Sequence, residues 1–198
     1  MGMSAPALSG VAAVSELTPV VGVKRILSAW LAYWLDGTTK SIGGNANVAW
    51  PSLVYQEVAT GQASSVAGQI CFDDGRDVLE TGIQVRVVLI PTTHKSWGDQ
   101  TASKHLQEDE YTVQFWISAN LRSGDPTWGS STEAVNAVAE ALTVILRSPD
   151  SIQQVKVLGV QPLIERSLGS VAIAVENEGA TVRLLTCRLR VWYRVSSM

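Results

Sequence analysis

The chain is poor in cysteine. Only Cys71 and Cys187 occur, and neither belongs to a CxxC motif or to a cluster of cysteine and histidine. The sequence therefore shows no disulfide framework and no zinc signature, and we expect a reducing compartment. Because Cys187 falls in an alternating apolar segment, we interpret it as a small core residue.

Long hydrophobic runs are also missing. The longest, Ile26 to Leu35, is far shorter than the roughly 20 residues that cross a bilayer. Residues 1–17 lack the cationic start and continuous apolar stretch of a secretory signal, and Pro6 breaks the myristoylation pattern. We therefore expect neither membrane insertion nor export.

Charge is low and nearly balanced. The chain has 15 Lys and Arg against 18 Asp and Glu, which gives a net charge of −3. This balance does not favour nucleic acid or an anionic membrane as a partner of the whole chain. With 46% hydrophobic residues in 198, the composition indicates one globular domain. We expect a flexible N-terminal arm over 1–17 and a single α/β domain over 18–198.

The motifs of common enzymes do not occur. The sequence has no GxxxxGK[ST] phosphate loop, no GxGxxG, and no GxSxG or HExxH. An acidic turn at 73–80, followed by His94, offers the carboxylates that hard cations prefer, but its spacing matches no metal-binding loop. We interpret this turn as a solvated surface, and we expect no metal, no cofactor and no catalytic residue.

Two amphipathic helices are predicted, over 19–35 and 131–147. In both, apolar residues recur at intervals of three and four. A Thr-Pro pair begins the first helix, and a capping box of Ser130 and Glu133 begins the second. A Ser-Pro pair after residue 147 is expected to end the second.

Several segments read as strands. Apolar and polar residues alternate over 82–90, 110–121 and 181–195, which is typical of strands with one buried face. Further strands are expected at 53–59, 67–72, 154–164 and 170–176, with a loop over 38–52. Laying both helices on the apolar face gives an α+β fold of two layers, with a mainly antiparallel sheet and a long hairpin arm.

The hairpin arm is predicted from an extended polar loop at 91–109, which is longer than compact hairpins use. Loops of this length are usually functional or disordered. Because Trp97 lies within this loop, we interpret it as a binding arm that docks on a neighbour.

Tryptophan supplies further candidates. The chain has seven, and Trp116 and Trp192 fall on the polar side of their strands. Tryptophan is enriched at interface anchors, although each could instead lie over a neighbouring arginine as a local cation–π contact. Both readings stay open from the sequence.

Arginines form a stripe on the same polar side. Arg188, Arg190 and Arg194 alternate along the last strand, and Arg86 is expected on an adjacent one. The stripe fits a solvated face or a partner's acidic surface, and less well nucleic acid, whose binders usually carry more Lys and Arg. The acidic stretch 108–110 offers complementary charge for a self-associating ring. The candidate interface residues are Trp97, Trp116, Arg188, Arg190, Trp192 and Arg194.

The layout carries a resemblance. A helix, a β-meander with an extended hairpin arm, a second capped helix and the closing strand VRLLTCRLRVWY at 182–193 together resemble tail-terminator and related neck or tail-completion proteins of tailed bacteriophages, over residues 18–195. The resemblance implies a structural virion protein, assembled in the host cytoplasm, that forms a hexameric ring at the head-proximal end of the tail. It also implies docking to the connector and other tail or neck proteins, with no membrane and no sequence-specific nucleic acid, although DNA can pass through such a ring.

A second reading is a non-catalytic carbohydrate- or peptide-binding module. In it, Trp97, Trp116 and Trp192 serve as stacking surfaces for the ligand. This reading requires the three indoles to share one exposed site.

Overall fold

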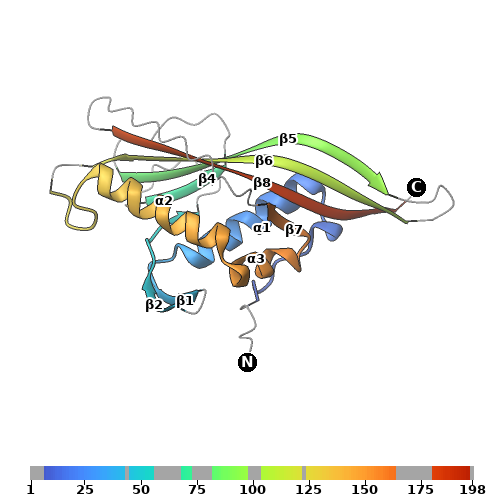
Figure 1. Cartoon of the computed structure of the whole chain (residues 1–198), viewed down its shortest axis with the longest axis horizontal. Helices are drawn as coiled ribbons and strands as arrows, with labels where there is room; N and C mark the ends of the chain where they lie inside the picture. The colour runs from blue at the N-terminus through green and yellow to red at the C-terminus, as the bar shows by residue number, and fades with distance from the viewer. Residues whose placement is uncertain are drawn as a thin grey trace.

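The computed structural model describes residues 7–42, 45–55, 68–72, 82–97, 104–121, 124–163 and 180–196. Within them, a layer of helices packs against one side of a sheet (Figure 1). The elements are η1 (Val14–Glu16), α1 (Pro19–Trp34), β1 (Thr39–Ile42), β2 (Asn45–Ala49), β3 (Val54–Tyr55), β4 (Gly68–Phe72), β5 (Gly82–Trp97), β6 (Lys104–Asn120), α2 (Ser131–Arg147), α3 (Pro149–Lys156), β7 (Val160–Leu163) and β8 (Ala180–Ser196).

The main sheet has six strands in the order β3-β4-β5-β6-β8-β7. The pairs β3–β4 and β4–β5 are parallel, and the other three pairs are antiparallel. The ladder between β6 and β8 is unbroken from Lys104 opposite Ser196 to Asn120 opposite Ala180. The predicted two-layer α+β fold with a mainly antiparallel sheet is therefore confirmed.

The alternation read from the sequence correctly identified the buried face. The predicted side chains of β5, β6 and β8 that are buried are Ile83, Val85, Val87, Tyr111, Val113, Phe115, Ile117, Ala119, Leu185, Cys187, Leu189, Val191 and Tyr193. Leu89 and Leu121 are only partly buried, and Gln84 and Ser118 on the opposite face are buried as well. Both predicted helices are confirmed to within a residue at each end. The Ser130 N-cap of α2 is formed, because the Glu133 N–H donates to Ser130 Oγ at 3.2 Å. The return bond of a capping box is not made, since the Ser130 N–H donates to Trp128 O and the Glu133 carboxylate accepts from the Ser130 hydroxyl instead.

Cys71 and Cys187 are both buried and are not joined by a disulfide. Burial raises the pKa of the Cys187 thiol to about 12. Because the thiolate is the reactive form, Cys187 is inert near neutral pH, as expected of a core residue.

The third helix was not predicted. The sequence reading placed a strand over 154–164, but α3 occupies 149–156 and only Val160–Leu163 is a strand. Pro149 ends α2 and also starts α3, since a proline at the first helical position removes no needed N–H. The buried face of α3 includes the polar residues Ser151 and Gln154, so its apolar spacing is too weak to reveal a helix.

Polar partners explain why that buried face of α3 is not apolar. The Trp30 indole N–H donates to Ser151 Oγ at 2.8 Å, and the Trp34 indole N–H donates to Gln154 Oε1 at 2.8 Å. Buried indole N–H groups need acceptors, and α3 supplies both. These two bonds join α1 to α3.

The loop predicted over 38–52 is partly wrong. Strands β1 and β2 form a two-stranded antiparallel hairpin there, with Thr39 opposite Ala49. The segment carries two glycines, two asparagines and other polar residues and no clear alternation, so its sequence reads as a loop. Tertiary contacts rather than local pattern specify this hairpin.

The flexible arm predicted over 1–17 is also corrected, for residues 7–17. Val14 in η1 is fully buried in the core, and its N–H donates to Leu158 O at 2.9 Å. Gly159 adopts φ +94°, and a Cβ there would lie 2.8 Å from the Trp192 carbonyl oxygen. The close approach of η1, this turn and β8 therefore requires a glycine. Residues 1–6 lie outside the described part.

A charged residue at position 14 tests this anchoring. We expect Val14→Asp to lower the free energy of unfolding by roughly 1–3 kcal/mol, because a carboxylate cannot remain unpaired in the core. The loss of unfolding free energy stays small because residues 7–17 can detach from the core without unfolding the rest. Limited proteolysis should then show faster cleavage before α1. Ser15→Asp, in the same turn but exposed, should change neither measurement. Equal effects of the two variants would contradict the anchoring.

The prediction of an extended loop over 91–109 is also wrong. Strand β5 continues to Trp97 and β6 begins at Lys104, so most of the segment is β-ladder. A register shift between Pro91 and Thr93 interrupts the ladder once. This part reads as a loop because its side chains on β5 are exposed on both faces, which removes the alternation that marks a half-buried strand.

Three other predictions fall outside the described residues. They are the strand at 170–176, the acidic turn at 73–80 and the end of the predicted strand at 56–59.

Candidate functional site

The outer ends of β5, β6 and β8 form a projecting arm. We define the arm as residues 90–97, 104–112 and 188–196. Its base is attached to the body, because residues 188–191 pair with β7 and the Trp192 N–H donates to Gly159 O at 2.9 Å, and the rest extends past the helices at the right of Figure 1. Every described side chain from Ile90 to Ser96 is exposed. The predicted hairpin arm therefore exists, but it has three strands instead of two.

Register places the arm residues in rows across the three strands. Directly paired residues of an antiparallel ladder lie on the same face of a sheet. From the body outward, the rows on the face opposite the helices are Ile90–Thr112–Arg188, Thr93–Glu110–Arg190, Lys95–Glu108–Trp192 and Trp97–Leu106–Arg194. Five of the six candidate interface residues thus lie in the arm.

Carboxylates on β6 neutralise part of the arginine stripe. Arg188 contacts Glu110 at 3.0 Å, and Arg190 Nε lies 3.3 Å from Glu108. Lys95 adds a longer contact of 3.8 Å to Glu108. The acidic stretch was expected to meet the basic face of another subunit, but the structure pairs these charges within one chain.

The ion pair between Arg188 and Glu110 should be weak. Because the Arg188 side chain is 44% exposed and solvent screens the pair, we expect a double-mutant cycle of Arg188→Gln and Glu110→Gln to give a coupling of about 0.2–1 kcal/mol in chemical denaturation. The same variants should leave the number of associated subunits unchanged. A loss of association in Arg188→Gln alone would instead assign Arg188 to a partner.

The helix-side face of the arm holds a small polar cluster. Asp109 accepts a hydrogen bond from Tyr193 OH at 2.9 Å, and its other oxygen lies 2.5 Å from His94 Nδ1. Burial, followed by the interaction with Asp109, raises the pKa of Tyr193 to about 12. A tyrosine that stays protonated is no general base. The contacts of Asp109 with Tyr193 and His94 join the three strands of the arm.

Trp116 lies apart from the arm. It pairs with Arg86 on β5 and Leu184 on β8, is half-buried, and its indole N–H donates to Gln114 Oε1 at 3.2 Å. It lies eight positions along β6 from the row of Trp192, which corresponds to about 27 Å at 3.4 Å per residue. The structure therefore does not bring the three tryptophans of the ligand-binding reading into one site.

A groove beside α2 was not predicted from the sequence. It has a volume of about 530 Å³, and its lining residues are Trp50, Pro51, Thr127, Trp128, Glu133, Ala137, Glu140, Ala141 and Val144. Val144 is 43% exposed although it is apolar, and it lies in the last turn of α2. The signal available in the sequence was the pair of tryptophans outside predicted elements, but only the fold brings them to one helix face.

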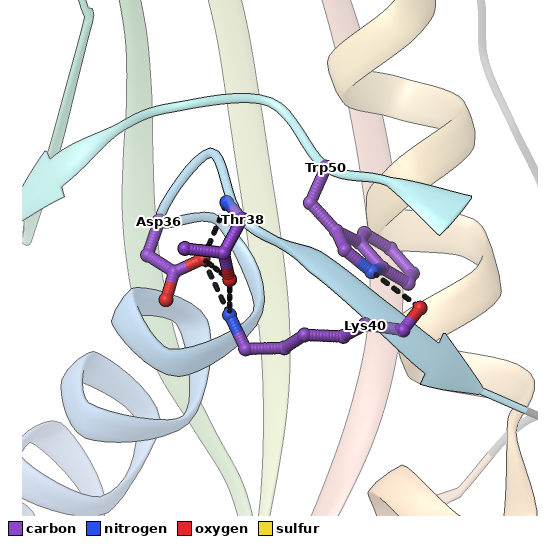
Figure 2. A network of polar contacts seen from close by, with 4 residues as sticks. All are labelled: Asp36, Thr38, Lys40 and Trp50. Atoms are coloured by element: carbon purple, nitrogen blue, oxygen red, sulfur yellow. Dashed lines mark hydrogen bonds and ion pairs between the residues drawn. The ribbon is translucent and has the colours of Figure 1, made fainter. Parts of the chain in front are cut away.

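Polar contacts fix the wall of the groove that contains Trp50 (Figure 2). The Trp50 indole N–H donates to Lys40 O at 3.3 Å, and its ring lies 5.3 Å from that of Trp34. Asp36 accepts hydrogen bonds from the backbone and side chain of Thr38 and from Lys40. Burial disfavours the charged form of Asp36, but these bonds outweigh it and lower the pKa of the carboxyl. The hairpin of β1 and β2 is therefore held to the end of α1.

Other site types find no support in the described residues. There, no three or more His, Cys, Asp and Glu side chains gather as metal ligands. The helices of this part of the chain are too short or too polar to cross a membrane. Neither a scan against protein-family models nor a search of curated proteins finds a match to this chain.

Proposed function

We propose that this chain is a structural protein of a phage tail or neck that associates with copies of itself into a ring. The ring stands at the head-proximal end of the tail and joins it to the connector. The observation that carries the proposal is the projecting arm, whose outer end presents Leu106 and Trp192.

The arm has the properties of a surface made to be covered. The arm buries Tyr111, Leu189, Val191 and Tyr193 on its helix side but leaves apolar side chains partly exposed on the other face. Strands that extend past a core are marginal in water unless another surface covers them. Leu106 is 44% exposed, Ile90 is also exposed, and Trp192 is only half-buried. Burying these side chains against another chain contributes hydrophobic free energy that the isolated subunit does not gain.

The layout supports the phage assignment. The two-layer subunit, the long arm and the capped second helix are the features in which the sequence resembles tail-terminator and neck proteins. A ring needs a contact between two different surfaces of the subunit, and an arm at one end of the molecule suits this geometry.

The alternative, a carbohydrate- or peptide-binding module, has less support. Stacking sites place aromatic rings within one ligand length of each other, whereas Trp116 lies about 27 Å along the sheet from Trp192. No other described feature favours a sugar or a peptide over a second copy.

The proposal is tested by mass and shape in solution. We expect sedimentation velocity and light scattering to give a discrete multimer, and negative-stain images to show closed rings. Antibodies against the chain should label the head-proximal end of the tails of the phage that encodes it. A strict monomer at all concentrations, or a virion without label, would refute the proposal.

A further inference from the structure

The arm and the groove are two different surfaces at opposite ends of the subunit. Figure 1 shows the arm at the right, and the hairpin of β1 and β2 with the start of α2 at the left. We infer that the arm end of one copy binds in the groove beside α2 of the next copy. The inference rests on the proposed ring and names the two surfaces that form its contact.

The contact between arm and groove must join two copies of the chain. The arm points away from its own body, so it cannot fold back into the groove at the other end of the same chain. A contact between two unlike surfaces repeats from copy to copy and closes into a ring if the rotation allows it. The groove therefore stays open in one subunit and is filled in the assembly.

The apolar parts of the two surfaces fit in kind and size. The arm end presents Leu106 and the half-buried Trp192. The groove offers Trp50, Trp128 and Val144, and its volume of about 530 Å³ is within the range of pockets that enclose a ligand of several rings. A buried aromatic or aliphatic anchor in such a pocket is the usual centre of a protein interface.

The charges at the rims of the two surfaces are opposite. Glu133 and Glu140 lie at the groove, where Glu133 also contacts the capping serine Ser130, so Glu140 is the more available carboxylate. On the arm end, Lys95 is 53% exposed, and Arg194 is exposed with no ion pair within the described residues. Opposite charge across a rim sets the orientation of a partner and excludes wrong partners.

A charge in the groove tests the apolar contact. We expect Val144→Glu to raise the dissociation constant of the multimer at least tenfold in sedimentation velocity, with the folded subunit intact by circular dichroism. The matched control is Val157→Glu, at a valine that is 67% exposed and lies outside the groove, which should leave association unchanged. Equal association of both variants, in a wild type that does form multimers, would overturn the inference.

A charge swap tests the pairing of the two surfaces. Glu140→Lys and Lys95→Glu should each weaken association, because each places like charges at the contact. Mixing the two single variants should restore it, since every contact in an alternating ring of even number then joins opposite charges. The double variant should associate as the wild type does.

The results of these experiments distinguish a failure of the arm-in-groove contact from a failure of the proposed ring. A monomeric wild type contradicts the proposed ring. A multimeric wild type whose single variants dissociate, without rescue by mixing or by the double variant, overturns the arm-in-groove contact. Association unaffected by any of these variants also overturns it and assigns the groove to another occupant, such as a separate tail protein.

Discussion

Replacing Trp30 by alanine is expected to lower the free energy of unfolding by about 3–5 kcal/mol. Trp30 is fully buried, and its indole N–H donates to Ser151 Oγ at 2.8 Å. The substitution leaves a cavity between α1 and α3 and a buried hydroxyl without its partner, and both are costly. Chemical denaturation followed by circular dichroism measures the loss.

Two controls separate the cavity from the hydrogen bond. Trp30→Phe keeps much of the volume and removes the N–H, so we expect a cost of about 1–3 kcal/mol, most of it from the unsatisfied hydroxyl. Val20→Ala, at an exposed position of the same helix, should cost less than about 0.5 kcal/mol. A Trp30→Ala variant that loses under about 1 kcal/mol would show that α3 does not pack on α1 as described.

Replacing Trp192 by alanine is expected to abolish association at concentrations where the wild type is a multimer. An interface tryptophan at a central position costs at least about 2 kcal/mol when truncated, which is about 30-fold in each dissociation constant. Because Trp192 is half-buried on the outer face of the arm, the stability of the subunit should fall much less than in Trp30→Ala. Light scattering over a dilution series measures the association, and thermal unfolding measures the stability.

The matched control is Trp116→Ala. Trp116 is also a half-buried tryptophan on the same sheet face, but it lies over the body of the sheet and away from the arm. We expect it to leave association unchanged. If Trp116→Ala dissociates the multimer and Trp192→Ala does not, the contact lies over the body and the arm is not the interface.

These two predictions address separate properties of the molecule. Trp30 lies in the layer between α1 and α3, where its contacts are complete within one chain. Trp192 lies where the subunit leaves apolar surface beside charged side chains. A change that affects folding and a change that affects assembly should therefore be separable in a single chain.

The sequence alone determined the elements whose signals are local. The N-cap at Ser130 and the period of three and four placed α2 at the residues where the structure has it. Alternation along β6 and β8 identified the buried face residue by residue, because a strand with one face on the core needs apolar side chains at every second position. These patterns require no knowledge of distant contacts.

The tertiary structure alone decided the rest. Helix α3 has polar residues on its buried face that only the indoles of α1 satisfy, and η1 is ordered because Val14 fits against Gly159. The ion pairs of Arg188 and Arg190 and the groove at Trp50 join residues far apart in the chain. The β5 part of the arm reads as a loop because residues 90–96 are exposed on both faces and so show no alternation, whereas β8 keeps its alternation along the arm. Contacts between distant segments leave no local pattern, and for that reason the candidate interface could be predicted by residue type but not located until the strands were paired.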